Sequence, residues 1–327
     1  MKAFDYTKPS TEAAAILAGS NATARYIAGG TLLVDLLRLD VEQPELLVDL
    51  NGLSWGAIEV GPSGLRIGAL VKNSVLAEHP AVLSDYPVLA QALLSGASPQ
   101  IRNMASVAGN LLQRTRCAYF RDAAVPACNK RKPGSGCAAI GGFTRMHAVL
   151  GGSEQCIASH PSDMSVALLA LDALIHTRGP GGERVIPMGD FHTLPGARPH
   201  VESVLLPGEL VTAVSIPRSS FAHHSAYVKA RDRASFAFAL ASAAAALELD
   251  GNTVRSARVA LGGVGTKPWR CPEVERALVG KPANSDSFRT ASALALNDAH
   301  PSADNRFKIE LGRRVIARAL EEARSRP

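Results

Sequence analysis

A cysteine-rich stretch near the middle of the chain interrupts an otherwise regular pattern of apolar residues. From residue 114 to residue 156, Gly, Pro, Lys and Arg replace the apolar periods of the flanking sequence, and the stretch holds four of the five cysteines. An irregular segment of this length inside a compact domain must be ordered by something other than a hydrophobic core. We therefore expect a clamped insertion at residues 114–157.

The spacing of these cysteines limits what could clamp the insertion. The four are Cys117, Cys128, Cys137 and Cys156, at intervals too wide for the Cys-x-x-Cys pairs of zinc ribbons. Four thiolates fully ligate a [4Fe–4S] cluster, and nearby cations would stabilise the negative charge of such a site. Basic residues interleave with the first cysteines, namely Arg114, Arg116, Arg121, Lys130, Arg131 and Lys132. Structural zinc and disulfides are the alternatives, although synthesis in a reducing compartment disfavours disulfides.

Composition argues against several classes of protein. With 327 residues and 46% hydrophobic content, the chain can bury the cores of two or three domains. No stretch of roughly eighteen residues is free of charge, so membrane insertion is not expected. The formal charge of +6 comes with no zinc-finger, RNA-recognition or homeodomain pattern, so nucleic-acid binding is not expected either. The N-terminus has no secretory or twin-arginine signal of its own, which predicts synthesis in the cytoplasm.

Strand, turn and helix signals alternate before residue 220. Residues 25–27 have the pattern of a strand, 28–30 that of a tight turn, and 32–39 that of a helix with Thr31 as its N-cap. The other expected elements are strands at 45–50, 64–69, 201–206 and 210–216, a helix at 87–94, and a helix that leads into a strand over 164–175.

A domain boundary is expected near Phe221, after the β-like segments end at Pro217. Beyond it we expect a strand at 226–230, an alanine-rich helix at 236–247, a strand at 254–261 and two C-terminal helices. The last helix should cover 307–323, because Leu311, Val315 and Ala319 recur at helical spacing opposite charged residues.

The strand, glycine turn and helix at residues 25–39 form a candidate phosphate site. Unpaired backbone N–H groups and the positive end of a helix should meet at Gly29, Gly30 and Thr31. The G-x-G-x-x-G fingerprint and the Walker lysine loop are absent from the sequence, which argues against a nicotinamide Rossmann site and an ATPase. A second small-residue loop at 100–111 supplies more hydroxyl and amide donors, so that two loops could grip one long ligand. A purely structural turn is the alternative.

Three motifs, in this order along the chain, resemble those of a known family. They are Ala28-Gly29-Gly30-Thr31 with Asp35, Ile101-Arg102-Asn103 with Ser106-Val107-Ala108-Gly109-Asn110, and His160-Pro161-Ser162-Asp163. The order resembles the FAD-binding subunit of the xanthine dehydrogenase and carbon monoxide dehydrogenase family. Residues 227–235 are similar to the start of that family's C-terminal domain, so the resemblance covers nearly the whole chain.

The resemblance implies an α+β fold in three parts. Residues 1–60 and 61–220 would form a two-part FAD-binding domain of the vanillyl-alcohol-oxidase (PCMH) type, with the iron–sulfur insertion in its second part. Residues 221–327 would form an α+β C-terminal domain like that of the carbon monoxide dehydrogenase flavoprotein.

The family pattern also implies which residues bind FAD. The pyrophosphate would be wrapped by Ile27, Ala28, Gly29, Gly30, Thr31, Leu32 and Leu33, with Ser106, Gly109 and Asn110 joining from the second loop. Asp163 is implied for the ribityl or ring region, and Leu210 and Val211 for apolar packing on the flavin. Lys229 is implied for the isoalloxazine carbonyl edge, where an ammonium favours negative charge on a reduced flavin. The alternatives are an exposed strand lysine at Lys229 and a helix N-cap at Asp163.

The four-cysteine insertion resembles one branch of the family. That branch contains periplasmic aldehyde oxidoreductases and 4-hydroxybenzoyl-CoA reductase, whose flavin subunits carry an extra [4Fe–4S] cluster. Residues 111–117, 128–131 and 133–137 look closest to the aldehyde-oxidising members. The resemblance therefore implies Cys117, Cys128, Cys137 and Cys156 as the cluster ligands.

The implied function is electron transfer inside a larger oxidoreductase. Electrons would pass from iron–sulfur centres through FAD to an external acceptor, while a separate subunit oxidises an aldehyde. The implied partners are a small [2Fe–2S] subunit and a large molybdopterin subunit in a heterotrimer, and export to the periplasm would use a partner's twin-arginine signal. No catalytic residue is expected here, because the sequence has no Ser-His-Asp grouping and no H-E-x-x-H motif. Rival hypotheses are a self-contained flavoprotein oxidase or reductase, a flavin subunit of a hydroxybenzoyl-CoA reductase-like complex, and a scaffold held by zinc and an adenine nucleotide.

Overall fold

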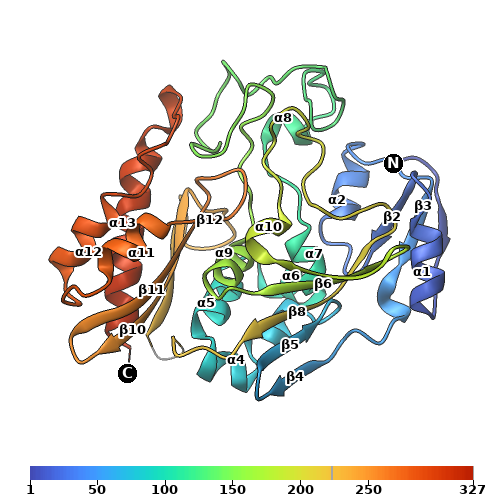
Figure 1. The fold of residues 1–327 in the computed structure, drawn as a ribbon. Coiled ribbons are helices and arrows are strands. Elements are labelled where there is room, and N and C mark those ends of the chain that lie inside the picture. The colour runs from blue at the N-terminus through green and yellow to red at the C-terminus, as the bar shows by residue number, and fades with distance from the viewer. Residues whose placement is uncertain (222–223, 327) are drawn as a thin grey trace.

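The computed structural model describes residues 1–221 and 224–326 and contains three β-sheets. Figure 1 shows the small N-terminal sheet at one end of the molecule, the C-terminal sheet at the other end, and the five-stranded sheet between them. Helices cover the sheets, and the expected α+β class is confirmed.

The N-terminal sheet is parallel, in the order β1-β3-β2. Its strands and the helices that connect them are β1 (Asp5–Thr7), α1 (Glu12–Gly19), β2 (Ala24–Ile27), α2 (Leu33–Arg38) and β3 (Leu46–Asp49). A short 3-10 helix, Leu50–Gly52, follows β3. Ala15 of α1 packs on Val48 of β3 in a small core, so β2 is held rigidly where it leads into the glycine turn.

The central sheet is antiparallel, in the order β4-β5-β8-β6-β7. Its strands are β4 (Ile58–Gly61), β5 (Gly64–Gly68), β6 (Leu174–Gly179), β7 (Gly182–Pro187) and β8 (Leu210–Pro217). The helices of this part are α3 (Asn73–Ala77), α4 (Pro80–Asp85), α5 (Pro87–Ser95), α6 (Pro99–Met104), α7 (Val107–Leu111), α9 (Asp163–Ala170) and α10 (Met188–Phe191). Ile67, Leu89 and Leu168 join sheet and helices in one core.

The C-terminal sheet has the order β12-β11-β10-β9. Its elements are β9 (Ser225–Ala230), β10 (Ala241–Asp250), β11 (Thr253–Gly262), β12 (Trp269–Arg270), α11 (Pro272–Leu278), α12 (Ser285–Ser292), a 3-10 helix (Ala303–Asn305) and α13 (Phe307–Arg324). Helix α13 packs on β9 and β10 from one side, whereas α5 and α9 contact the sheet from the other side. Across residues 1–221 and 224–326, none of the helices combines the length and the apolar character needed to cross a membrane.

The alanine-rich segment forms strand β10, so the expected helix at 236–247 is wrong. β10 pairs with β9 on one edge and with β11 on the other. Alanine has the highest helix propensity, but both faces of this strand are covered. Ala243 and Ala245 belong to the core under the C-terminal helices, whereas Ala244 belongs to the core of the central part. Small side chains on both faces let the flanking helices approach the sheet, and this packing outweighs local propensity.

Three smaller expectations also need correction. Within the described residues, 201–206 form no strand, although Ser203 makes an isolated bridge to His192. Thr31 is not an N-cap, because α2 has Leu32 at that position and no side chain caps it. Three α-helices, rather than two, follow β12 in the described part of the C-terminal region. The other expected strands and helices are present.

The insertion is irregular, as expected. Residues 112–162, all of which the structure describes, carry one helix of four residues, α8 (Ala118–Arg121). The rest forms the loops at the top of Figure 1. Isolated β-bridges, which are backbone pairings, join Cys128 to Cys137 and Ser153 to Cys156 and tie these loops together locally.

Candidate functional site

The glycine turn after β2 lies directly against the second small-residue loop. A Cβ added at Gly29 would lie 1.9 Å from the carbonyl oxygen of Met104, so only glycine permits this approach. Gly30 has a φ of +69°, in the left-handed region that also favours glycine. In the second loop, the Ser106 hydroxyl accepts a hydrogen bond from the backbone N–H of Gly109 at 3.2 Å and caps α7.

The two loops border a cavity of about 780 Å³. It is lined by Ile27, Ala28, Gly29, Gly30, Thr31, Leu32, Leu33, Ser106, Gly109 and Val211 of the expected FAD residues. A second cavity of about 680 Å³ shares Thr31, Leu32 and Gly109 with the first. It is lined by the other expected residues Asn110, Asp163 and Lys229. Leu210 lines neither cavity; it packs in the N-terminal core, because neighbouring strand residues point to opposite faces.

A buried ion pair lies in the wall of the second cavity. The Lys229 ammonium is 2.7 Å from Asp163 Oδ2, and the two side chains are 3% and 8% exposed. The alternative of an exposed strand lysine is therefore wrong. The hydroxyl of Tyr227 donates to Asp163 Oδ1 at 2.5 Å. Burial, and then the neighbouring Asp163, raise the pKa of Tyr227 well above its ordinary value, so that hydroxyl keeps its proton.

Hydrogen bonds connect this ion pair to the second loop. Ser162 is the N-cap of α9: its hydroxyl accepts from the backbone N–H of Ser165 at 3.0 Å. Asp163 is therefore not the N-cap of α9 but its first residue, directly after the cap. The Ser162 hydroxyl also donates to Asn110 Oδ1 at 2.7 Å. The second loop, α9 and β9 are therefore held in one arrangement around the cavity.

Two arginines that sequence reasoning assigned to the insertion face the same cavity. Arg121 Nη2 lies 2.6 Å and Arg116 Nη1 3.6 Å from one oxygen of Asp35, so two cations share one carboxylate. Burial, and then Arg121, lower the pKa of Arg116 to about 10. Arg116 Nε and Arg121 Nη1 are buried donors without a hydrogen-bond partner. An anionic ligand in this cavity would satisfy them, so the wall fits a group such as a dinucleotide.

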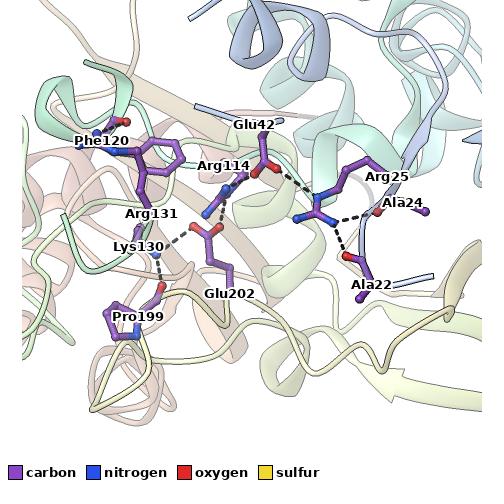
Figure 2. Close-up of polar contacts among 10 residues, drawn as sticks. All are labelled: Ala22, Ala24, Arg25, Glu42, Arg114, Phe120, Lys130, Arg131, Pro199 and Glu202. Atoms are coloured by element: carbon purple, nitrogen blue, oxygen red, sulfur yellow. Dashed lines mark hydrogen bonds and ion pairs between the residues drawn. The ribbon is translucent and has the colours of Figure 1, made fainter. Parts of the chain in front are cut away.

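Other basic residues of the insertion bind carboxylates at the edge of the first cavity (Figure 2). Arg114 lies between Glu42 and Glu202. Lys130 Nζ is 2.9 Å from Glu202 Oε1 and 2.9 Å from the carbonyl oxygen of Pro199. Arg25 continues the chain of charges through Glu42 at 3.1 Å. The insertion is thereby attached to the N-terminal part and to residues 199–202.

Arg131 shapes the insertion itself. Its guanidinium donates to the backbone carbonyl oxygens of Tyr119 at 2.5 Å and Phe120 at 2.6 Å, and also to that of Val125. The expectation that the basic residues serve the thiols therefore needs refinement, because Arg114, Lys130 and Arg131 are engaged mainly with carboxylates and carbonyl oxygens. Lys130 is also close enough to Cys156 to favour its thiolate.

The four cysteines of the insertion lie near one another as free thiols. Burial, and to a smaller extent the neighbouring Cys156 and Cys128, raise the pKa of Cys117 to about 11. Burial also raises the pKa of Cys156, and Cys137 and Cys128 act in the same direction. Among the described residues, however, no three His, Cys, Asp or Glu side chains group closely enough to hold one metal ion.

These thiols fit a cluster in kind and number. A cubane cluster binds each of its four thiolates through a different iron, so its ligands surround a volume and do not converge on one atom. A single tetrahedral zinc ion needs convergence at about 2.3 Å from each sulfur. The four thiols match the ligand set of a cluster, and a four-cysteine zinc site would take the same ligands.

Comparison with known proteins agrees with this geometry. Residues 2–219 match the model of the FAD-binding domain in molybdopterin dehydrogenase, and residues 225–323 match that of the carbon monoxide dehydrogenase flavoprotein C-terminal domain. The chain is 52% identical to the aldehyde oxidoreductase FAD-binding subunit PaoB of Escherichia coli, over 99% of both chains. It is 27% identical to the carbon monoxide dehydrogenase medium chain of Afipia carboxidovorans, over 99% of this chain and 97% of that one.

Solved structures show the same relationship. The structure of reconstituted carbon monoxide dehydrogenase from Oligotropha carboxidovorans matches with a TM-score of 0.79 and 25% identity, over 100% of this chain and 99% of that chain. Quinoline 2-oxidoreductase from Pseudomonas putida matches with a TM-score of 0.76 and 25% identity, over 99% and 98%. The expected family is confirmed. The chain therefore belongs to the FAD-binding subunits of the molybdenum hydroxylase family, which are oxidoreductase subunits of the aldehyde oxidoreductase and xanthine dehydrogenase type.

Proposed function

We propose that this chain is the FAD- and [4Fe–4S]-binding electron-transfer subunit of a molybdenum-containing aldehyde oxidoreductase. The observation that carries the proposal is that a third cavity, of about 120 Å³, is lined both by Cys117 of the insertion and by Asp163 of the proposed flavin site. The residues proposed for the flavin and those proposed for the cluster therefore border one cavity. The high identity to a relative named as an aldehyde oxidoreductase subunit supports the substrate class.

The proposed FAD site consists of the two adjoining cavities that the expected FAD residues line. The loop of residues 27–33 and the residues Ser106, Gly109 and Asn110 would hold the pyrophosphate with backbone N–H groups and amide donors. Val211 would pack on the dinucleotide from β8. Leu210 lies in the N-terminal core and would only support this strand.

Asp163 and Lys229 would lie at the flavin itself. Bound FAD would supply the exchange between one-electron and two-electron steps, whereas the protein orients the ring and tunes its potential. The Lys229 ammonium, held by Asp163 in a buried wall, favours negative charge beside it. Arg116 and Arg121 add two more positive charges, which Asp35 balances only in part.

The cluster site is assigned to Cys117, Cys128, Cys137 and Cys156. The support is the donor set, the mutual proximity of the thiols and the clamping of the loop by Arg131. The thiols whose pKa is raised in the protein without iron would lose their protons on binding iron, because the positive charge of the metal favours the thiolate over the thiol.

We infer the wider assembly from the family resemblance. The substrate would be oxidised on a large molybdopterin subunit, electrons would arrive through a small [2Fe–2S] subunit, and an external acceptor would take them from this chain. In such a heterotrimer no acid or base of this chain need act on the substrate. Transport of the folded complex on a partner's twin-arginine signal would bring it to the periplasm.

Cofactor analysis of the native assembly tests the proposal. The full chain, purified without air together with its co-purifying subunits, should contain flavin, iron and acid-labile sulfide, with about four irons in this chain beyond those of the [2Fe–2S] partner. A colourless preparation would contradict it.

The same preparation separates the rival functions. Turnover of an organic substrate by the chain alone would favour a self-contained flavoprotein. Zinc in place of iron and sulfide would favour the scaffold hypothesis. Reduction of an aromatic CoA thioester by the assembly would favour the hydroxybenzoyl-CoA reductase-like alternative.

A further inference from the structure

A buried lysine beside the insertion has no carboxylate partner. Lys308 lies in the first turn of α13, and it is 0% exposed. Its Nζ donates to the carbonyl oxygen of Gly263 at 2.8 Å. In the part of the chain that the structure describes, no carboxylate forms an ion pair with this ammonium, and none contributes to its pKa shift. Burial, and then Arg145, lower the pKa of Lys308 to about 7.

The position of Lys308 is unfavourable for a cation in three ways. The side chain is removed from water, Arg145 adds a second positive charge, and the first turn of a helix carries the positive end of the helix dipole. An apolar side chain of similar length would fill the same space without these costs. A lysine at such a position is explained if an anion lies nearby in the working protein.

The start of α13 is fastened to the cysteine insertion. The side-chain amide of Asn305 donates to the carbonyl oxygens of His147 and Ala148, each at 3.4 Å. Asp304 Oδ2 accepts from the backbone N–H of Thr144 at 3.0 Å. The start of α13 is therefore fixed by hydrogen bonds to residues 144–148.

His147 links the lysine to a thiol. Its Nε2 lies 3.1 Å from Cys117 Sγ, and its buried Nδ1 has no hydrogen-bond partner. Burial, and then the charge of Lys308, lower the pKa of His147, so the two groups are close. Cys117, His147 and Gly263, which accepts from Lys308, line the same cavity of about 120 Å³.

We propose that Lys308 is a buried counter-charge of the iron–sulfur cluster and acts on it from the Cys117 side, behind His147. The inference rests on the cluster assignment of the proposed function. The basic residues of the insertion are partly balanced by carboxylates: Arg114 and Lys130 pair with Glu42 and Glu202, and Arg116 pairs with Asp35. Lys130 acts on Cys156, whereas Lys308 is a cation on the Cys117 side that has no carboxylate. A cluster with four thiolates carries net negative charge and supplies the anion that Lys308 otherwise lacks.

Two substitutions separate the charge of Lys308 from its hydrogen bond. Lys308→Met removes both, whereas Lys308→Gln removes the charge and keeps a donor for Gly263. Lys281→Met, at an exposed position, is the matched control. The full chain with its co-purifying subunits is compared in three respects: iron per flavin, the reduction potential of the cluster followed by electron paramagnetic resonance, and thermal melting before and after removal of iron by a chelator.

Both Lys308 variants should disfavour the more negative, reduced cluster by about tenfold, which is about 59 mV for a one-electron couple. After iron is removed, Lys308→Met should melt no lower than the wild type, because the uncompensated buried charge is gone. The Lys281 control should match the wild type in every measurement.

Three results would overturn the inference. One is a cluster potential in both Lys308 variants equal to that of the control. Another is a change in Lys308→Met alone, which would make the hydrogen bond to Gly263 the active feature. The third is a Lys308→Met protein that melts far lower than the wild type after iron removal, which would make the lysine a structural residue. Wild-type protein without iron and sulfide is a different outcome, because it would remove the cluster assignment itself.

Discussion

At Gly29 the backbone of the first loop lies against that of the second, and this contact tests the flavin site at the scale of one residue. Gly29→Ala would put a Cβ 1.9 Å from the carbonyl oxygen of Met104, so the loops must separate. We expect a loss of about 1–3 kcal/mol in the free energy of unfolding, as in other overpacked sites. The fraction of chains that retain flavin should fall with it. Absorbance of the purified protein and denaturant unfolding measure the two effects.

Gly61→Ala is the matched control for that substitution. A Cβ at Gly61 meets no atom within 4 Å, and the residue lies in a strand. It should retain flavin fully. Equal flavin content in the two variants would show that the contact between the loops does not shape the site.

Lys229 and Asp163 provide a second test at this scale. Lys229→Met leaves the Asp163 carboxylate buried without its cation, which should cost about 3–5 kcal/mol in the free energy of unfolding. Adding Asp163→Asn should recover most of this loss, because no charge is then left unpaired. Lys229→Met should also lower the reduction potential of the bound flavin, because the ammonium no longer favours negative charge on the reduced ring. The double variant should keep this lowered potential, because it lacks the ammonium too. If the double variant recovered the wild-type flavin potential together with its stability, the Lys229–Asp163 pair would have only a structural role.

At the scale of elements, the charges in Figure 2 join three parts of the chain that lie far apart in sequence. Glu202 is the connecting group, because it binds both Arg114 and Lys130 of the insertion. Burial alone would raise the pKa of Glu202, but Arg114 and Lys130 outweigh burial and hold the pKa below its ordinary value. A carboxyl group with a lowered pKa in the folded state stabilises the protein above its ordinary pKa, and the contribution disappears as the pH falls through the folded value.

Glu202→Gln should therefore change the pH dependence of stability. At pH 7 we expect a loss of about 1.5–3 kcal/mol in the free energy of unfolding. The loss should shrink as the pH falls through the lowered pKa of the folded state, because the wild-type carboxyl is then protonated too. Urea unfolding at a series of pH values measures this difference. Glu183→Gln is the control, since the Glu183 side chain is 67% exposed and should show little effect. A loss that stays the same across the acidic range would contradict the ionic account.

The elements also show where sequence reasoning succeeds. The glycine turn could be placed from the sequence because a left-handed φ at Gly30 and a close approach at Gly29 demand glycine locally. The strand β10 could not, because its alanines are explained only by helices that pack on both faces from distant parts of the chain. Likewise, nothing local marks Lys308 as buried, since it looks like an ordinary charged residue at the start of an amphipathic helix.

At the scale of the whole molecule, the insertion, the flavin cavities and the C-terminal domain meet around Cys117. Sequence reasoning found the cysteines and the flavin loops separately, through residue type and order. The sequence places Arg116 beside the thiols, and Arg116 does line the small cavity with Cys117. It also lines the cavity of Asp163 and Lys229 and shares Asp35 with Arg121, which the sequence could not show because tertiary packing brings these residues together.

Replacing one cysteine tests whether the two cofactor sites are separate. The backbone of Cys128 pairs with that of Cys137 in an isolated β-bridge. Cys128 lines neither of the two large cavities beside the glycine turn. Cys128→Ser should therefore remove most of the iron and sulfide of this chain, because a hydroxyl is a poor substitute for a thiolate ligand, while flavin content stays at the wild-type level. Cys271→Ser, which changes a buried thiol at the start of α11, should keep both. Loss of flavin with full retention of iron in Cys128→Ser would reverse the proposed assignment of the two sites, because the insertion would then serve the dinucleotide.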